Sequence, residues 1–305
     1  MKVSEITNTP GKQKGFTLAE ILVVIAILGL LATIIFTITG GAREQGKIAK
    51  GLYFSQHLHN SLGSYAAGIW SFDEGTGTLA NDISGWNNNG TLVNAPTWRC
   101  ATTDSDYTPS GQGCSLEFNG STQYVNAGNM VSLDIADLKI TIETWVKTTA
   151  TAPDTDVGMR VFTTYRGSNS SRFSLGMRAD RVFSYASPAG SFSGTSVIND
   201  GKWHHIVTTY DGATQKLYVD GSQENSRNFT LSGEFYSQND TIGAFHPTDG
   251  FWGGLIDEVR IYNTSLTSAQ IQSQYYAGLE RLLARNRLTR MNADKDWQES
   301  KNIWI

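Results

Sequence analysis

The chain has 305 residues, 17% of them charged, and its 24 Lys and Arg side chains are slightly outnumbered by 28 Asp and Glu. This length suits one large domain or two modest ones, and low charge with 31 glycines favours an all-β globular domain over a coiled coil or a disordered chain. Because no broad basic field is present, we expect no nucleic-acid partner.

The first predicted element is an apolar helix over residues 16–36, in which Glu20 is the only ionisable side chain. At 1.5 Å per residue this run would span roughly 30 Å, the thickness of a bilayer core. Three lysines and one acid precede it. The positive-inside rule therefore keeps the N-terminus in the cytoplasm and sends the rest of the chain outward. A carboxylate inside such a helix is costly and usually functional.

The sequence around the start of this helix resembles the N-terminus of type IV prepilins and pseudopilins. The match is a short basic leader ending at Gly15, then Phe16-Thr17-Leu18-Ala19-Glu20, then the apolar run. The resemblance implies that a membrane-embedded prepilin peptidase cleaves between Gly15 and Phe16, and that the new N-terminus is methylated. It also implies that other pilin-like subunits join through this helix, with the Phe16 amine of one subunit pairing with Glu20 of another. The alternative is an uncleaved signal anchor.

After Gly40-Gly41, apolar residues recur at helical spacing, which predicts an amphipathic continuation of the same helix. From about residue 69, short alternating runs are separated by Gly, Asn and Asp turns. Runs 203–211 and 216–220 each lead into an Asp-Gly step, a strong turn signal. We therefore divide the chain into a leader (1–15), a pilin-type helix (16–64), a β-sandwich head (65–278) and a basic helical tail (279–305).

Several phrases of the head, in this order, resemble the laminin-G-like, concanavalin A-like jelly-roll domains of bacterial surface proteins. They are WSFDE (70–74), DISGWNNNG (82–90), LEFNG (116–120), ITIETWV (140–146), DGKWHHIV (200–207), LYVDG (217–221) and GLIDEVRIY (254–262). The expected fold class is thus α+β. A long N-terminal transmembrane helix is followed by an antiparallel β-sandwich jelly roll and a C-terminal helix, whose Ser/Thr-capped start lies within 266–275.

The two cysteines, Cys100 and Cys114, show no zinc-type spacing to other ligands. A disulfide between them would close a loop of about 15 residues and stabilise the fold by roughly 3 kcal/mol. An exported head favours this disulfide over two free thiols, and the N-terminal segment predicts export.

A calcium site is a further expectation. Strict alternation over 256–262 places Asp257 on the same face as Val259 and Ile261, so an inward carboxylate would need compensation. Ca²⁺ could provide it, since this cation takes carboxylate and carbonyl oxygens. The resemblance implies a calcium between such a strand and an Asn/Gly-rich loop. The alternative is that Asp257 pairs with an arginine and the loop is only a turn. The expected ligands are Asp73, Asp82, Asn87 and Asp257.

Other chemistry is weakly signalled. His204 and His205 are adjacent on a strand and point to opposite faces, so we interpret both as structural. Trp86 and Trp252, beside glycine-rich turns, are the better candidates for stacking on a sugar. Nucleophile-elbow, P-loop and zinc-protease motifs are absent from the sequence, and no strand carries alternating acids, so we expect no enzyme.

Together these observations predict a pilin-like or pseudopilin subunit of the cytoplasmic membrane, with its N-terminus inside and a jelly-roll head outside. The head would bind glycans or another surface ligand. The alternatives are a membrane-anchored lectin-like protein that never polymerises and, less favoured, a carbohydrate-active enzyme. The basic tail predicts either a helix packed on its own domain or one that contacts anionic lipid or a partner.

Overall fold

The computed structural model describes residues 62–100, 108, 113–133, 139–166, 170–187, 189–230, 239–246 and 248–282. The predicted leader, the membrane helix with Gly15, Phe16 and Glu20, and the end of the basic tail lie outside these residues. Within the described part of the chain, no helix is both long and apolar enough to cross a membrane.

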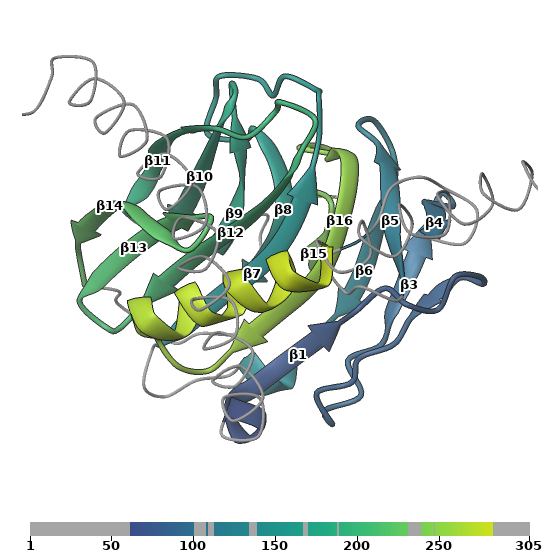
Figure 1. The fold of residues 1–305 in the computed structure, drawn as a ribbon, viewed down its shortest axis with the longest axis horizontal. Helices are drawn as coiled ribbons and strands as arrows, with labels where there is room; N and C mark the ends of the chain where they lie inside the picture. Colours follow the sequence, from purple (N-terminus) through teal and green to yellow (C-terminus); the bar gives the residue numbers. More distant parts are fainter. Residues whose placement is uncertain are drawn as a thin grey trace, which may run out of the picture. The chain divides into compact units, whose positions relative to one another are not determined.

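The head is a sandwich of two antiparallel sheets, which confirms the predicted β-sandwich (Figure 1). Among the described residues each sheet has eight strands. Sheet A runs β14 (Ser222–Asn228), β13 (Thr214–Val219), β12 (Trp203–Tyr210), β7 (Ile140–Lys147), β16 (Gly253–Tyr262), β5 (Cys114–Asn119) and β4 (Thr97–Cys100), with β1 (Ala66–Trp70) also paired to β16.

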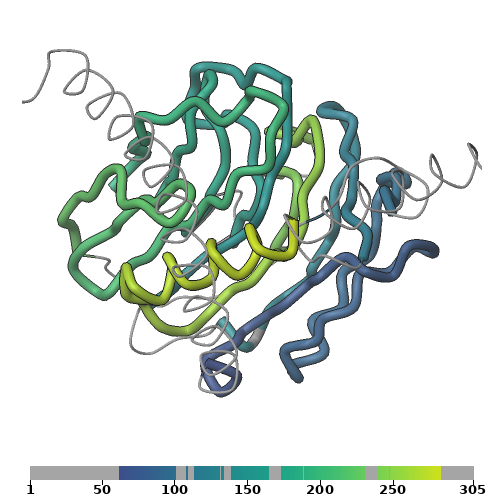
Figure 2. The backbone as a smooth tube through the Cα atoms, in the orientation of Figure 1, coloured from purple at the N-terminus to yellow at the C-terminus, as the bar shows by residue number. Residues whose placement is uncertain are grey.

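Sheet B runs β11 (Gly190–Val197), β10 (Arg181–Ala186), β9 (Ser170–Arg178), β8 (Met159–Arg166), β15 (Asp240–Ile242), β6 (Tyr124–Gly128), β3 (Gly90–Val93) and β2 (Leu79–Ala80). Two short 3₁₀ helices, η1 (Gly63–Tyr65) and η2 (Val131–Leu133), also belong to the head. Figure 2 shows that the segment after β1, in blue, forms one rim of the head.

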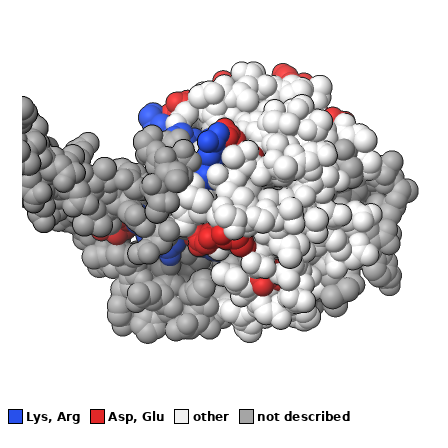
Figure 3. Space-filling model, turned by 90° about the vertical axis from the view of Figure 1, so that its right-hand side faces the viewer, with Lys and Arg blue, Asp and Glu red and all other residues white. Residues whose placement is uncertain are grey.

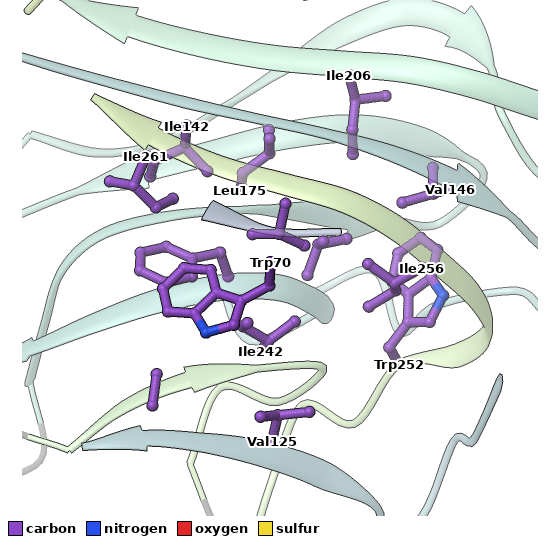
Figure 4. Close-up of a cluster of buried hydrophobic side chains, with 14 of the residues drawn as sticks. Trp70, Val125, Ile142, Val146, Leu175, Ile206, Ile242, Trp252, Ile256 and Ile261 are labelled. Carbon is purple, nitrogen blue, oxygen red and sulfur yellow. The ribbon is translucent and has the colours of Figure 1, made fainter. Parts of the chain in front are cut away.

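The core lies between the sheets and is built by alternation along each strand. On β7, Ile142 and Val146 point into the core, where they meet Trp70 and Ile256 (Figure 4). The residues of opposite parity on β7 are nevertheless buried as well, so that only Lys147 of this strand is partly exposed. The outer face of sheet A is therefore also covered at β7.

A C-terminal helix over residues 268–282 covers that outer face (Figure 1, yellow). Thr267 and Gln270 form a reciprocal cap, because the Thr267 N–H donates to Oε1 of Gln270 and the Gln270 N–H donates to Oγ1 of Thr267. This confirms the predicted Ser/Thr-capped start. A Cβ at Gly278 would collide with the Trp145 ring, so the helix approaches β7 closely at this glycine.

The expected alternation fails in β16. Ile256, Val259 and Ile261 all belong to the hydrophobic core, although 256 and 259 have opposite parity. The cause is a bulge between Asp257 and Arg260, with Glu258 in the left-handed region at φ 52°. The prediction that Asp257 shares a face with Val259 and Ile261 is therefore wrong. The bulge lies where the partner of β16 changes from β1 to β5.

The predicted disulfide joins Cys100 of β4 to Cys114 of β5, which are direct cross-strand partners. Gly75 lies against both sulfur atoms, and a Cβ there would be 3.1–3.2 Å from them. The disulfide therefore cross-links the edge strand β4 to β5, and the segment that follows β1 packs against its sulfur atoms.

Candidate functional site

The loop over residues 81–89, between β2 and β3, is organised by one carboxylate. Asp82 accepts four hydrogen bonds: Oδ1 from the backbone N–H groups of Ile69 and Ser84, both at 2.9 Å, and Oδ2 from the Asn88 N–H at 2.9 Å and the Ser84 hydroxyl at 2.8 Å. A carboxylate has about four lone-pair positions, so its accepting capacity is used in full. We call residues 81–89 the Asp82 loop.

The Asp82 loop also covers the edge of β1 that does not face β16. The Ile83 N–H donates to the Ile69 carbonyl at 2.9 Å, and the Asn88 side-chain amide donates to the Ala67 carbonyl at 2.8 Å. Uncovered strand edges leave backbone groups without partners. The loop provides those partners and is thereby fixed to the sandwich.

Local conformation fits the residue types of this loop. Gly85 and Asn87 both have positive φ, at 96° and 61°. Glycine adopts this region without strain, and asparagine tolerates it better than most residues. The turn therefore folds as the sequence DISGWNNNG dictates.

This scaffold presents apolar side chains to solvent. Ile83 is 61% exposed, Trp86 is 53% exposed and Leu79, at the start of the hairpin, is 50% exposed. The other large hydrophobic side chains exposed in the described part of the chain are Tyr65 and Val197. Trp86 was predicted from the sequence as a contact residue, whereas Ile83 and Leu79 were not. The exposure of Ile83 and Leu79 could have been predicted, because each is an apolar residue among turn residues, where no core position is expected.

Two of the four expected calcium ligands, Asp82 and Asn87, lie in the Asp82 loop. No group of three or more His, Cys, Asp or Glu side chains that could hold a metal exists among the described residues. All four acceptor positions of Asp82 receive N–H or O–H donors, and Oδ1 of Asn87 accepts from the Asn89 amide at 3.1 Å. Calcium binding stays a prediction.

Asp73 and Asp257 lie in other surroundings. The Asp73 carboxylate occupies the space where a Cβ at residue 113 would be, beside the disulfide-bearing end of β5. Asp257 is fully buried at the bulge in β16, where its Oδ1 accepts from the Glu258 N–H at 2.9 Å.

Trp252 cannot stack on a sugar. Its side chain is fully buried and lies beside Ile256 in the core (Figure 4). The glycines next to it mark a close approach to β5, because the Gly120 N–H donates to the Trp252 carbonyl at 2.9 Å. The prediction for Trp252 is therefore wrong, whereas exposed Trp86 keeps the role as a prediction.

The middle of the outer face of sheet B is closed. Arg160 is 1% exposed, and its guanidinium lies over two aromatic rings. The guanidinium carbon Cζ is 4.4 Å from the ring centre of Phe183 and 5.1 Å from that of Phe245. The same group donates to the Val157 carbonyl at 2.7 Å and to the Ser174 hydroxyl. Loop residues thus pack onto this face through Arg160.

The outer face of sheet A holds a buried charge cluster that sequence reasoning missed. Arg260 donates to Oε1 of Glu143 at 2.8 Å and to Glu258, while Nε2 of His205 lies 3.6 Å from Oε1 of Glu143. Burial opposes the charge of Glu143, but His205 and Arg260 lower its pKa. Arg281 of the C-terminal helix reaches Oε1 of Glu258 at 3.5 Å. The described start of the basic tail therefore packs on its own domain.

His204 points away from this cluster and lies between two carboxylates, 2.9 Å from Oδ2 of Asp220 and 3.1 Å from Oδ1 of Asp200. Partial burial opposes a charged ring, yet hydrogen bonds to Asp220 and Asp200 raise the pKa of His204. The hydrogen bond from Lys202 lowers the pKa of Asp200 to about 2. The two histidines thus lie in separate environments, as the alternation predicted.

Residues 119–272, half of the chain, match the sequence profile described as the concanavalin A-like lectin/glucanases superfamily. The chain belongs to this superfamily. Its head is a concanavalin A-like domain, and residues 10–36 match the prokaryotic N-terminal methylation motif. No curated protein matches the sequence.

Solved structures share the fold of the head at low sequence identity. A structure of botulinum neurotoxin type C, described by the dependence of its cell entry upon interaction with two ganglioside molecules, has a TM-score of 0.53 and 13% identity, with 72% of this chain and 53% of that chain covered. The binding domain of botulinum neurotoxin DC in complex with rat synaptotagmin II has a TM-score of 0.52 and 12% identity, with coverages of 71% and 52%. The chain thus spans about half the length of these domains.

Domain 4 of AbnA, an extracellular arabinanase from Geobacillus stearothermophilus in complex with arabinotriose, is similar at 17% identity, with 69% of this chain and 98% of that domain covered. Its TM-score of 0.48 marks a looser likeness. At these identities the likeness shows the fold alone.

Proposed function

We propose that this protein is a pilin-like or pseudopilin subunit that is inserted in the cytoplasmic membrane and then assembled into a filament. Its extracytoplasmic head would bind glycans or another surface ligand and so serve adhesion. The observation that carries the proposal is the methylation motif at 10–36 on the same chain as a concanavalin A-like head. Glu20, alone in the apolar run, is the acid such an assembly needs for the amine of Phe16.

We infer that the head binds its ligand without cleaving it. Glycoside hydrolysis needs two carboxyl groups that flank the substrate. Glu143, Asp257 and Glu258 of sheet A are buried, and Glu258 pairs with Arg281 of the covering helix. No substrate could reach them without displacement of that helix.

Mass spectrometry of the N-terminus, on protein from membranes and from sheared surface filaments, tests the assembly proposal. We expect a chain that begins with N-methylated Phe16 in both fractions. Gly15→Val should block cleavage, whereas Gly11→Val, a change in the same leader, should leave it intact. An unprocessed N-terminus would contradict the proposal. Correct processing with absence from the filaments would instead indicate an anchored lectin-like protein.

A further inference from the structure

The C-terminal helix covers the middle of the outer face of sheet A, and Arg160 with its loops covers the middle of sheet B, which leaves the rim of the head as a candidate ligand surface. At the rim, Leu79, Ile83 and Trp86 belong to a single hairpin and are each at least half exposed. Single exposed apolar residues need no explanation, but several on one small element mark a contact surface.

The hairpin is rigid where it carries these side chains. Asp82 holds the turn through four hydrogen bonds, and Ile83 and Asn88 bind it to the β1 backbone. Binding to a surface that is already ordered avoids the entropy cost of ordering it. The loop that carries Trp86 would therefore lose little conformational entropy when a ligand binds.

The polar groups around Trp86 are uncharged amides. Asn81, Asn87 and Asn89 are exposed, whereas the one carboxylate of the turn, Asp82, is engaged internally. Residues 62–98 contain no Lys or Arg, and Glu74 contacts the base of the loop through the Asn81 N–H at 2.6 Å. Figure 3 shows one face of the head, on which large uncharged areas separate a few acidic and basic side chains.

This chemistry selects one class of ligand. A pyranose or furanose ring has an apolar C–H face that packs on an indole, and hydroxyl groups at its edge that suit amide donors and acceptors. Anionic sugars would require Arg or Lys, which bind carboxylate and sulfate groups strongly. We propose that the Asp82 loop is a preorganised platform on which a neutral oligosaccharide stacks against Trp86, an inference that rests on the proposed glycan-binding function of the head.

Binding of the full-length protein to a defined glycan panel tests this inference. The protein is kept in lauryldimethylamine oxide, because a sugar-based detergent would compete for the site. The neutral probes are cello-, malto-, xylo- and arabino-oligosaccharides, and the anionic probes are polygalacturonate and chondroitin sulfate fragments. We expect binding of at least one neutral probe. Trp86→Ala should weaken it about tenfold, a factor in the range of one aromatic contact.

Two controls make the result specific. Trp86→Phe keeps an aromatic face and should retain most of the affinity, and Tyr65→Ala removes an aromatic that is 49% exposed outside the loop and should change nothing. Because Trp86 is exposed, its replacement should leave the melting temperature unchanged, which separates lost binding from lost folding. Asp82→Ala should lower both the affinity and the melting temperature, as expected of a positioning residue.

Each other outcome has a definite meaning. Neutral-glycan binding that Trp86→Ala does not weaken would overturn the assignment of this site and leave the proposed function standing. Preference for the anionic probes would overturn the ligand class. No binding of any glycan by the wild-type protein would overturn the glycan-binding function itself, and this inference with it.

Discussion

At Asp82 one carboxylate accepts hydrogen bonds from residues that lie 13 positions before it and six after it. Hydrogen bonds to a charged acceptor each contribute more than neutral ones, and each donor that loses its partner adds a desolvation cost. This explains how a glycine- and asparagine-rich turn is held in one conformation.

We therefore expect a graded series at this position. Ser84→Ala removes one of the four hydrogen bonds and should cost about 1 kcal/mol of unfolding free energy. Asp82→Ala removes all four and should cost about 2–4 kcal/mol. Urea denaturation followed by far-UV circular dichroism measures both. Equal effects of the two substitutions would show that Asp82 does not organise the loop.

His204 should give the head a pH-dependent increment of stability. Because Asp220 and Asp200 raise the pKa of His204 in the folded state, the charged ring stabilises the fold in full below about 6.5, the ordinary histidine value. The increment is lost as pH rises through the raised folded-state pKa. It should be at most about 1 kcal/mol, because the group is partly exposed.

The measurement is the difference in unfolding free energy between wild type and His204→Gln at pH 5.5 and pH 9. The difference should shrink at the higher pH, because the ring of His204 loses its charge there. A difference that is the same at both pH values would contradict the charged-histidine interpretation.

At the scale of elements, the sequence predicted correctly those features that depend on contacts between residues close together in the chain. The Thr267–Gln270 cap and the turns of the Asp82 loop follow from residue types a few positions apart. The β16 face assignment failed because the bulge at Asp257 and Glu258 arises where two partner strands meet, and neither partner is near β16 in the sequence. Alternation alone contains no information on such a junction.

The docking of the C-terminal helix gives a prediction at this scale. Gly278→Ala should destabilise the head by about 1–3 kcal/mol, because the new Cβ would collide with the Trp145 ring and displace the helix. Gly63→Ala is the matched control, since a Cβ there meets no atom within 4 Å. Thermal denaturation of both variants gives the comparison, and indistinguishable melting temperatures would contradict close packing at Gly278.

The disulfide between β4 and β5 gives a second prediction for an element. The Cys100→Ala/Cys114→Ala double variant should lose about 3 kcal/mol of unfolding free energy, because the open chain gains conformational freedom in the unfolded state. Reduction of the wild-type protein should produce a similar loss and should leave the double variant unaffected. A stability of wild type that is insensitive to reductant would argue against a structural role for the bond.

At the scale of the whole molecule, the proposed function requires two parts of the chain: an N-terminal helix that is inserted in the membrane, and a head that binds a ligand. Glu20→Gln should retain cleavage and methylation at Phe16 but lower the amount of protein in sheared filaments by about tenfold or more, because an intersubunit charge pair in an apolar core is lost. Glu44→Gln, at the next acid after the apolar run, should assemble normally. Immunoblots of filament and membrane fractions measure the ratio. If the Glu20→Gln variant assembled as well as wild type, the proposed charge pair between Glu20 and the Phe16 amine would be refuted.

The sequence by itself determined the apolar N-terminal run with its acid, the sandwich with its C-terminal helix and the cysteine pair, because these follow from composition, periodicity and ordered local phrases. Only the tertiary structure decided that Trp252 is in the core while Trp86 is exposed, and that Asp82 serves the backbone of β1. It also brought Glu143, Arg260 and His205 together under a helix. The burial of a side chain and the identity of its hydrogen-bond or ion-pair partners depend on which strands, distant in sequence, become neighbours. The packing of the whole sandwich determines these neighbours.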